Sequence, residues 1–139
     1  MNYLLDTNVI SELRKRKPHG AVPAWLRSLR DEDIQIPAVA IAELQDGAEI
    51  ARRQDSAKAC ELEQWIDRIM STFVVLSMDG SMFRDWARLM NGKSDDLAAD
   101  AMIAATARAH RLTVATRNVK HFTIFGVSVF NPFTYKENL

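Results

Sequence analysis

The stretch YLLDTNVISEL, residues 3–13, joins a short apolar run to a helical pattern through one acid, Asp6. Residues 3–5 are predicted to be a strand and residues 7–16 the helix after it. The same alternation continues, with further strands predicted at 34–36, 72–78, 112–116 and 127–130 and further helices at 22–30, 38–53, 55–70, 79–91 and 95–110. Strands that alternate with helices need crossover connections. The sequence therefore predicts an α/β fold with a central, mostly parallel sheet and helices on both of its faces.

The composition is that of an ordinary globular protein of one domain. The 139 residues include eighteen Lys and Arg against eighteen Asp and Glu, so the formal net charge is zero. A protein that holds nucleic acid through a global basic excess is excluded, but a local site is not. The one cysteine, Cys60, rules out an internal disulfide and a multi-cysteine zinc site, and we expect its thiol to be buried or half-buried. No apolar run is long enough for a signal peptide or a membrane span, so we expect a cytoplasmic protein.

Three acids lie where a charge needs an explanation, because burying an unpaired charge is costly. Asp6 follows the first strand, Glu43 interrupts the apolar start of the helix 38–53, and Asp100 precedes an alanine-rich helical face. Each also has a plainer interpretation. Asp6 fits a helix N-cap, Glu43 fits an edge position with its carboxylate in water, and Asp100 fits a first-turn acid that favours the helix dipole.

Together the three acids suggest one site, since they could converge at one end of the sheet. Like charges at close range repel one another and need a compensating cation. Hard oxygen ligands favour Mg²⁺ or Mn²⁺ over zinc. A metal held by carboxylates suits phosphoryl chemistry, because it activates water and stabilises charge on a phosphate.

Five motifs, in order, resemble the PIN-domain ribonucleases, specifically the VapC/FitB-like toxins of bacterial toxin–antitoxin pairs. They are LLDTNVISEL at 4–13, AVAIAEL at 38–44, DAMIAATA at 100–107, VATRNVKHF at 114–122 and GVSVFNPF at 126–133. The resemblance covers nearly the whole chain, so residues 1–139 are expected to form a single PIN domain, a three-layer α/β/α sandwich.

The resemblance also implies residue roles and an activity. Acids that match Asp6, Glu43 and Asp100 hold Mg²⁺ or Mn²⁺ in the family, and the metal-activated water cleaves an RNA phosphodiester bond. Asn8 would orient the first acid by hydrogen bonds. Thr116 and Asn118 match polar residues that line the same pocket.

One position departs from the family pattern. Three residues after Asn118 this branch usually has Asp or Glu, whereas this chain has His121. His121 is either a surface histidine or a neutral imidazole that contacts water or phosphate or ligates Mn²⁺. The pocket loses one negative charge either way, so we expect one principal metal.

The partners are also implied by the resemblance. An antitoxin of the VapB/FitA type would block the pocket and carry the complex to operator DNA, and the toxin would form a homodimer. Four aromatic residues are candidates for exposed dimer contacts, although core packing is the favoured interpretation: Trp25, Trp65, Phe83 and Trp86.

The sequence also bears on three alternatives to the nuclease. A PIN-like module that binds without catalysis stays open because of His121. A haloacid-dehalogenase-type phosphatase needs an acid where Asn8 stands. A response-regulator receiver would need Thr116 and Lys120 on successive strand ends, and they are too close together in the chain for that.

The zero net charge conceals a separation along the chain. Residues 1–100 carry thirteen Lys and Arg against seventeen Asp and Glu, a net of −4, and residues 101–139 carry five bases against one acid, a net of +4. This distribution favours a small acidic metal pocket with a basic rim.

Overall fold

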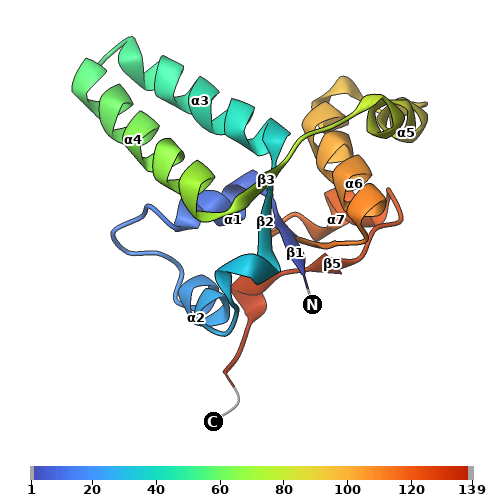
Figure 1. Cartoon of the computed structure of the whole chain (residues 1–139), viewed down its shortest axis with the longest axis horizontal. Helices are drawn as coiled ribbons and strands as arrows, with labels where there is room; N and C mark the ends of the chain where they lie inside the picture. The colour runs from blue at the N-terminus through green and yellow to red at the C-terminus, as the bar shows by residue number, and fades with distance from the viewer. Residues whose placement is uncertain (1, 138–139) are drawn as a thin grey trace.

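A five-stranded sheet forms the centre of the protein, as the computed structural model shows for residues 2–137 (Figure 1). The ends of the predicted domain, residues 1, 138 and 139, lie outside this described part. The strands are β1 Tyr3–Leu5, β2 Ile34–Pro37, β3 Val74–Leu76, β4 Thr113–Ala115 and β5 Val129–Phe130. They lie in the order β3-β2-β1-β4-β5, and all four pairings are parallel. The predicted parallel sheet is confirmed, and β1 lies at its centre.

Seven α-helices connect and cover the strands within residues 2–137. They are α1 Thr7–Glu12, α2 Ala21–Arg27, α3 Ala38–Arg52, α4 Ser56–Thr72, α5 Gly80–Met90, α6 Ala98–His110 and α7 Val119–Thr123. Short 3-10 turns occur at Asp31–Asp33, Asp95–Leu97 and Pro132–Thr134. In Figure 1 the pair α3 and α4 extends to one side of the sheet, and α5 and α6 lie on the other.

Two hydrophobic cores, one on each face of the sheet, confirm the three-layer α/β/α arrangement. Neighbouring residues of β1 point to opposite faces, as the period of a strand requires. Leu5 packs with residues of α1, α2 and α4, including the buried Trp25 and Trp65, and Leu4 packs with residues of α6 and with Phe122 of α7. β1 is therefore buried on both faces of the sheet. The backbone of Asp6, which directly follows β1, is held rigidly as a result.

Several bounds of the predicted elements differ in the structure, and two of the changed helix ends have an identifiable cause. The helix predicted over 7–16 ends at Glu12, because the Glu12 carboxylate accepts hydrogen bonds from Lys15 Nζ and from the N–H of His19 and folds the basic segment back. The helix predicted over 55–70 continues to Thr72, which donates its hydroxyl to the Arg68 carbonyl at 2.7 Å. The helix α7 was not expected at all.

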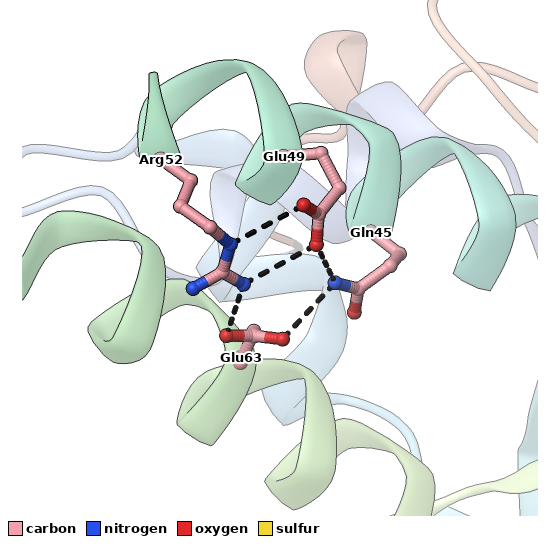
Figure 2. A network of polar contacts seen from close by, with 4 residues as sticks. All are labelled: Gln45, Glu49, Arg52 and Glu63. Atoms are coloured by element: carbon pink, nitrogen blue, oxygen red, sulfur yellow. Dashed lines mark hydrogen bonds and ion pairs between the residues drawn. The ribbon is translucent and has the colours of Figure 1, made fainter. Parts of the chain in front are cut away.

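A polar network joins α3 to α4 (Figure 2). The Arg52 guanidinium contacts Glu63 of α4 at 2.6 Å and Glu49 of its own helix at 3.2 Å. The Gln45 amide donates to both of these carboxylates, at 3.0 Å to Glu49 and 3.1 Å to Glu63. The network therefore fixes α3, the helix that carries Glu43, against α4.

The aromatic residues and the cysteine complete the comparison. Trp25 and Trp65 are buried, as the core interpretation predicts, whereas Phe83 is exposed on α5. Trp86 is half-buried and donates its indole N–H to the Ala98 carbonyl at 2.9 Å. The expectation for Cys60 was wrong, because the residue lies on the solvent side of α4 and its thiol is exposed. No helix in residues 2–137 is long and apolar enough to cross a membrane.

Candidate acidic site at the carboxyl end of the sheet

Asp6 follows the central strand β1 and is only 5% exposed. It is the N-cap of α1, where its Oδ1 accepts the N–H of Thr7 at 2.7 Å. Its Oδ2 accepts the hydroxyl of Thr116 at 2.7 Å. Asp6 is therefore both the helix cap of the plain interpretation and a buried carboxylate at the edge where open α/β sheets place their ligands.

Thr116 follows β4, the strand beside β1, and is fully buried. Its N–H donates to the carbonyl of Phe130 at 2.9 Å, which fixes its backbone to β5. Its hydroxyl accepts the N–H of Asn118 at 2.9 Å while it donates to Asp6. Hydrogen bonds in such a chain polarise one another, so Thr116 and the backbone of Asn118 together orient the Asp6 carboxylate.

Asp100 and His121 form a second hydrogen-bonded pair, next to the pair of Asp6 and Thr116. Asp100 lies in the first turn of α6, and its Oδ2 lies 2.9 Å from Nδ1 of His121 on α7. The Asp100 side chain is 20% exposed and that of His121 is 51% exposed. With Asp100 ionised, the proton of this hydrogen bond belongs on Nδ1, which leaves Nε2 as the free ring nitrogen.

Glu43 reaches the cluster from α3. Its Oε1 accepts the hydroxyl of Thr7 at 2.6 Å, and Thr7 is the residue next to Asp6. The Glu43 residue is exposed, as the edge interpretation expects. The same carboxylate is therefore hydrated and tied to the segment that carries Asp6.

Electrostatics couples the three acids. Burial raises the pKa of Asp6, and the charge of Asp100 raises it further, against the hydrogen bonds from Thr116 and Thr7. Burial also raises the pKa of Asp100, and the charge of Glu43 adds to this effect, whereas the hydrogen bond from His121 lowers it. A bound cation would relieve both the repulsion and the burial cost.

The residues present fit a hard divalent cation through donor type and charge. Asp6 and Asp100 offer hydrogen-bonded carboxylate oxygens, and Glu43 offers a third carboxylate on an exposed side chain that is bound to Thr7. In the arrangement described for residues 2–137, no three His, Cys, Asp or Glu side chains are close enough together to hold a metal ion. A metal ion shared by all three acids would thus need their carboxylates to come closer together than they are in this arrangement.

Asn8 differs from its expected role. Its Oδ1 is buried and finds no hydrogen-bond partner within residues 2–137. The side-chain hydrogen bond that orients Asp6 comes from Thr116 instead. Asn8 therefore leaves an unpaired acceptor two residues from Asp6.

Two pockets adjoin the acidic cluster. One, of about 190 Å³, includes Thr7 and Glu43. The other, of about 400 Å³, lies beside His121 and is lined by Arg117, Asn118, Val119, Lys120, His121 and Asn131. A larger hollow of about 580 Å³ between the end of α1 and α4 contains none of the predicted site residues, so size alone would point to a different place.

Two residues of the site were not singled out from the sequence. Thr7 binds Glu43, and its position directly after the strand-end acid was the available signal. Arg117 lines the pocket beside His121, and its place in the motif 114–122, next to Thr116, was the available signal.

Known proteins similar to this chain include toxins and toxin–antitoxin complexes. The PIN domain family model matches residues 3–124. Toxin FitB of Neisseria gonorrhoeae is 39% identical over 94% of this chain and 97% of that protein. VapC ribonuclease Y4jK of Sinorhizobium fredii is 36% identical over 94% of this chain and 96% of that protein.

The crystal structure of FitAcB from Neisseria gonorrhoeae superposes with a TM-score of 0.82 at 38% identity and covers 95% of this chain and 99% of that one. A structure of FitAB bound to an IR36 DNA fragment also gives 0.82, at 35% identity and 99% coverage of both chains.

Proposed function

The chain belongs to the PIN-domain family, among the VapC- and FitB-like toxins of toxin–antitoxin systems, and from this membership we propose that it is a metal-dependent endoribonuclease. The observation that supports the proposal is the buried Asp6 carboxylate, which Thr116 orients and whose pKa is raised by burial and by Asp100. A buried anion with anionic neighbours is suited to bind a cation. The proposed reaction is hydrolysis of an RNA phosphodiester bond.

Asp6, Glu43 and Asp100 would hold Mg²⁺ or Mn²⁺. When bound, the ion would lower the pKa of water and stabilise negative charge on the phosphate. The protein's own contribution is positional. Thr116 and the N–H of Thr7 fix both oxygens of Asp6, and His121 fixes one oxygen of Asp100, so two carboxylates are set before any substrate arrives.

The test is cleavage of a structured RNA by purified protein with Mg²⁺, with Mn²⁺ or with EDTA. Asp6→Asn and Asp100→Asn should each lower the cleavage rate by about 10²-fold or more, because each removes a charge needed in the site. Asp79→Asn is the matched control, since Asp79 caps α5 as Asp6 caps α1 and lies outside the site. Cleavage that persists in EDTA, or in Asp6→Asn protein, would contradict the proposal.

A PIN-like module that binds without catalysis is the second candidate. The observation that favours it is His121, which stands where an acid is expected, together with the exposed Glu43. RNA binding that needs no metal, with no cleavage by clean protein, would support this candidate over the nuclease.

We also propose that the chain acts in the cytoplasm, pairs with an antitoxin and reaches operator DNA only through it. Support comes from the relatives, since FitAB is a complex and is bound to DNA in one structure. The net charge of zero agrees, because the chain lacks the basic excess of a DNA-binding protein. Expression should arrest growth, and the product of the adjacent upstream reading frame should rescue it. Gel shifts with and without that product test the route to DNA.

A homodimer is the proposed state of the toxin, with a larger assembly once the antitoxin binds. The exposed Phe83 on α5 is a candidate contact. Sedimentation of the purified chain measures its mass, and Phe83→Ser should shift it toward the monomer if this face is the interface.

A further inference from the structure

The pocket beside His121 lies next to the acidic cluster, and two of its lining residues make hydrogen bonds to that cluster. Its lining residue His121 contacts Asp100, and the N–H of its lining residue Asn118 binds the Thr116 hydroxyl that orients Asp6. The pocket has a volume of about 400 Å³. It is therefore the space that a substrate extending from the acids toward the end of β4 would enter.

Arg117 is held in this pocket by an aromatic ring. Its guanidinium lies 4.6 Å from the ring centre of Phe133, which is only 8% exposed. The N–H of Phe133 in turn donates to Oδ1 of Asn131 at 3.0 Å. An arginine stacked in this way keeps its planar set of donors in a fixed direction, and that set matches the oxygens of a phosphate.

The positive charge of the pocket is not neutralised by nearby carboxylates. Within residues 2–137, Arg117 and Lys120 form no ion pair, whereas Arg52 and Arg108 are each bound to acids. Both free bases are exposed. An anion that enters the pocket therefore displaces no existing partner.

We propose that this pocket binds a nucleotide of an unpaired RNA strand next to the phosphate that is cleaved, with Arg117 and Lys120 on its backbone phosphate. The proposal rests on the proposed nuclease function, which places the reacting phosphate at the acids. The Asn118 side chain brings amide donors and acceptors to the same pocket, which suits the edge of an unstacked base. Along the path of the RNA, the acids that would hold a cation are followed by the positively charged side chains of the pocket.

The experiment measures RNA binding separately from cleavage. The Asp6→Asn protein is titrated in Mg²⁺ into a fluorescein-labelled, single-stranded RNA 12-mer of mixed sequence, and the Kd is followed by anisotropy over a range of salt concentrations. In this background Arg117→Ala should raise Kd about tenfold and lower the slope of log Kd against log salt by about 0.7, the value for one contact to a single strand. Arg117→Lys should lie between, since it keeps the charge and loses the fork.

Two further variants distinguish a loss of RNA binding from a loss of folding. Lys120→Ala changes an exposed side chain of α7 and should also weaken binding and lower the salt slope. Arg84→Ala removes the same charge as Arg117→Ala from an exposed position on α5, and it should leave Kd unchanged.

The outcomes separate this proposal from the nuclease proposal. If the wild type cleaves RNA while Arg117→Ala and Lys120→Ala keep the Kd and salt slope, the pocket proposal is overturned and the nuclease stands. If the wild type does not cleave but both variants lose RNA affinity, the nuclease fails and the pocket is supported. If the variants lose affinity only for a co-purified antitoxin, the pocket is a protein contact and the proposal is overturned.

Discussion

The Thr116 hydroxyl donates to Oδ2 of Asp6 at 2.7 Å and joins two residues that are 110 positions apart in the chain. The bond forms because Asp6 and Thr116 follow β1 and β4, neighbouring parallel strands whose carboxyl ends meet at the same edge. It also lowers the pKa of Asp6 against the effect of burial. Thr116 thus favours the ionised form of a buried acid, against the effect of burial, and holds its carboxylate in one direction.

Thr116→Val should remove this bond with little change in volume. Partners that orient a metal-binding residue are usually worth 10- to 100-fold in metal affinity or activity, so we expect a loss of about that size in RNA cleavage. Thr116→Ser keeps the hydroxyl and should retain most of the rate. Equal activity of the Val and Ser variants would show that the bond has no role in the reaction.

Asp6→Asn should make the metal-free protein more stable at neutral pH. Burial and Asp100 raise the pKa of Asp6, so the folded state binds the proton more tightly than the unfolded state. Wild-type stability therefore falls as the pH rises from below the ordinary Asp pKa to above the raised one, and the variant avoids this loss. We expect a gain of about 1 kcal/mol, or a few degrees in Tm, in EDTA at pH 7.

The control for this gain is Asp79→Asn, which changes an N-cap away from the acids. It should leave the melting temperature close to that of the wild type. A lower Tm for Asp6→Asn at pH 7, or an equal gain in both variants, would contradict the electrostatic account.

The sequence predicted the fold well where periodic signals are long. The helix expected over 38–53 is observed as Ala38–Arg52, and its apolar stripe is long enough to indicate it from the sequence. The five residues of α7 are too few to show a period, and the N-cap Asn118 makes no side-chain capping hydrogen bond. That helix depends on the burial of Phe122 in the second core, which is a tertiary contact.

The candidate site could be predicted in its chemistry but not in its contacts. Asp6 follows a predicted strand of a parallel sheet, so its position alone indicated the edge where such sheets place their ligands. The choice of Thr116 over Asn8 as the partner of Asp6 depends on side-chain rotamers. No local pattern in the sequence reports such a choice.

His121→Asp should increase metal binding. In the wild type, the histidine supplies a hydrogen bond to Asp100 where an acid would supply charge. We expect one Mn²⁺ per wild-type chain, and a second ion or at least tenfold tighter binding in the variant, measured by calorimetry against an EDTA-stripped baseline. His110→Asp, at the exposed far end of α6, is the matched control. Two well-occupied ions in Mn²⁺-soaked wild-type crystals would show this expectation to be wrong.

Arg52→Ala should lower the melting temperature only slightly. The guanidinium in Figure 2 bridges Glu49 and Glu63, and these carboxylates raise the pKa of Arg52. The network is open to solvent, where ion pairs add little and are screened by salt. We expect a drop of a few degrees at low ionic strength that fades in high salt. Arg53→Ala, one residue along and exposed, should show neither effect, and a large salt-independent drop for Arg52→Ala would contradict the screened ion-pair account.

Glu12→Gln should destabilise the fold at neutral pH but should have little effect on stability at acid pH. The buried Glu12 accepts hydrogen bonds from Lys15 Nζ at 2.9 Å and from the N–H of His19 at 3.2 Å. The hydrogen bond from Lys15, opposed by burial and aided by His19, lowers the pKa of Glu12 from its ordinary value of 4.5. A lowered pKa in the folded state gives stability that is present above the ordinary value and is lost as the pH falls through the lowered one.

Urea denaturation of the wild type and Glu12→Gln over a pH series measures this dependence. At pH 7 the variant should be less stable by on the order of 1 kcal/mol, since it keeps an acceptor but loses the charge that Lys15 binds. The difference should shrink once the wild-type carboxyl is protonated as well. Glu61→Gln provides the comparison, because the Glu61 side chain is 72% exposed and its carboxylate is as far as 3.8 Å from Lys58 Nζ. The effect of this substitution on stability should be small at every pH. If the difference in unfolding free energy between Glu12→Gln and the wild type grew at acid pH, the pH dependence would be opposite to the one expected. The Glu12 carboxylate would then not be what stabilises the turn after α1.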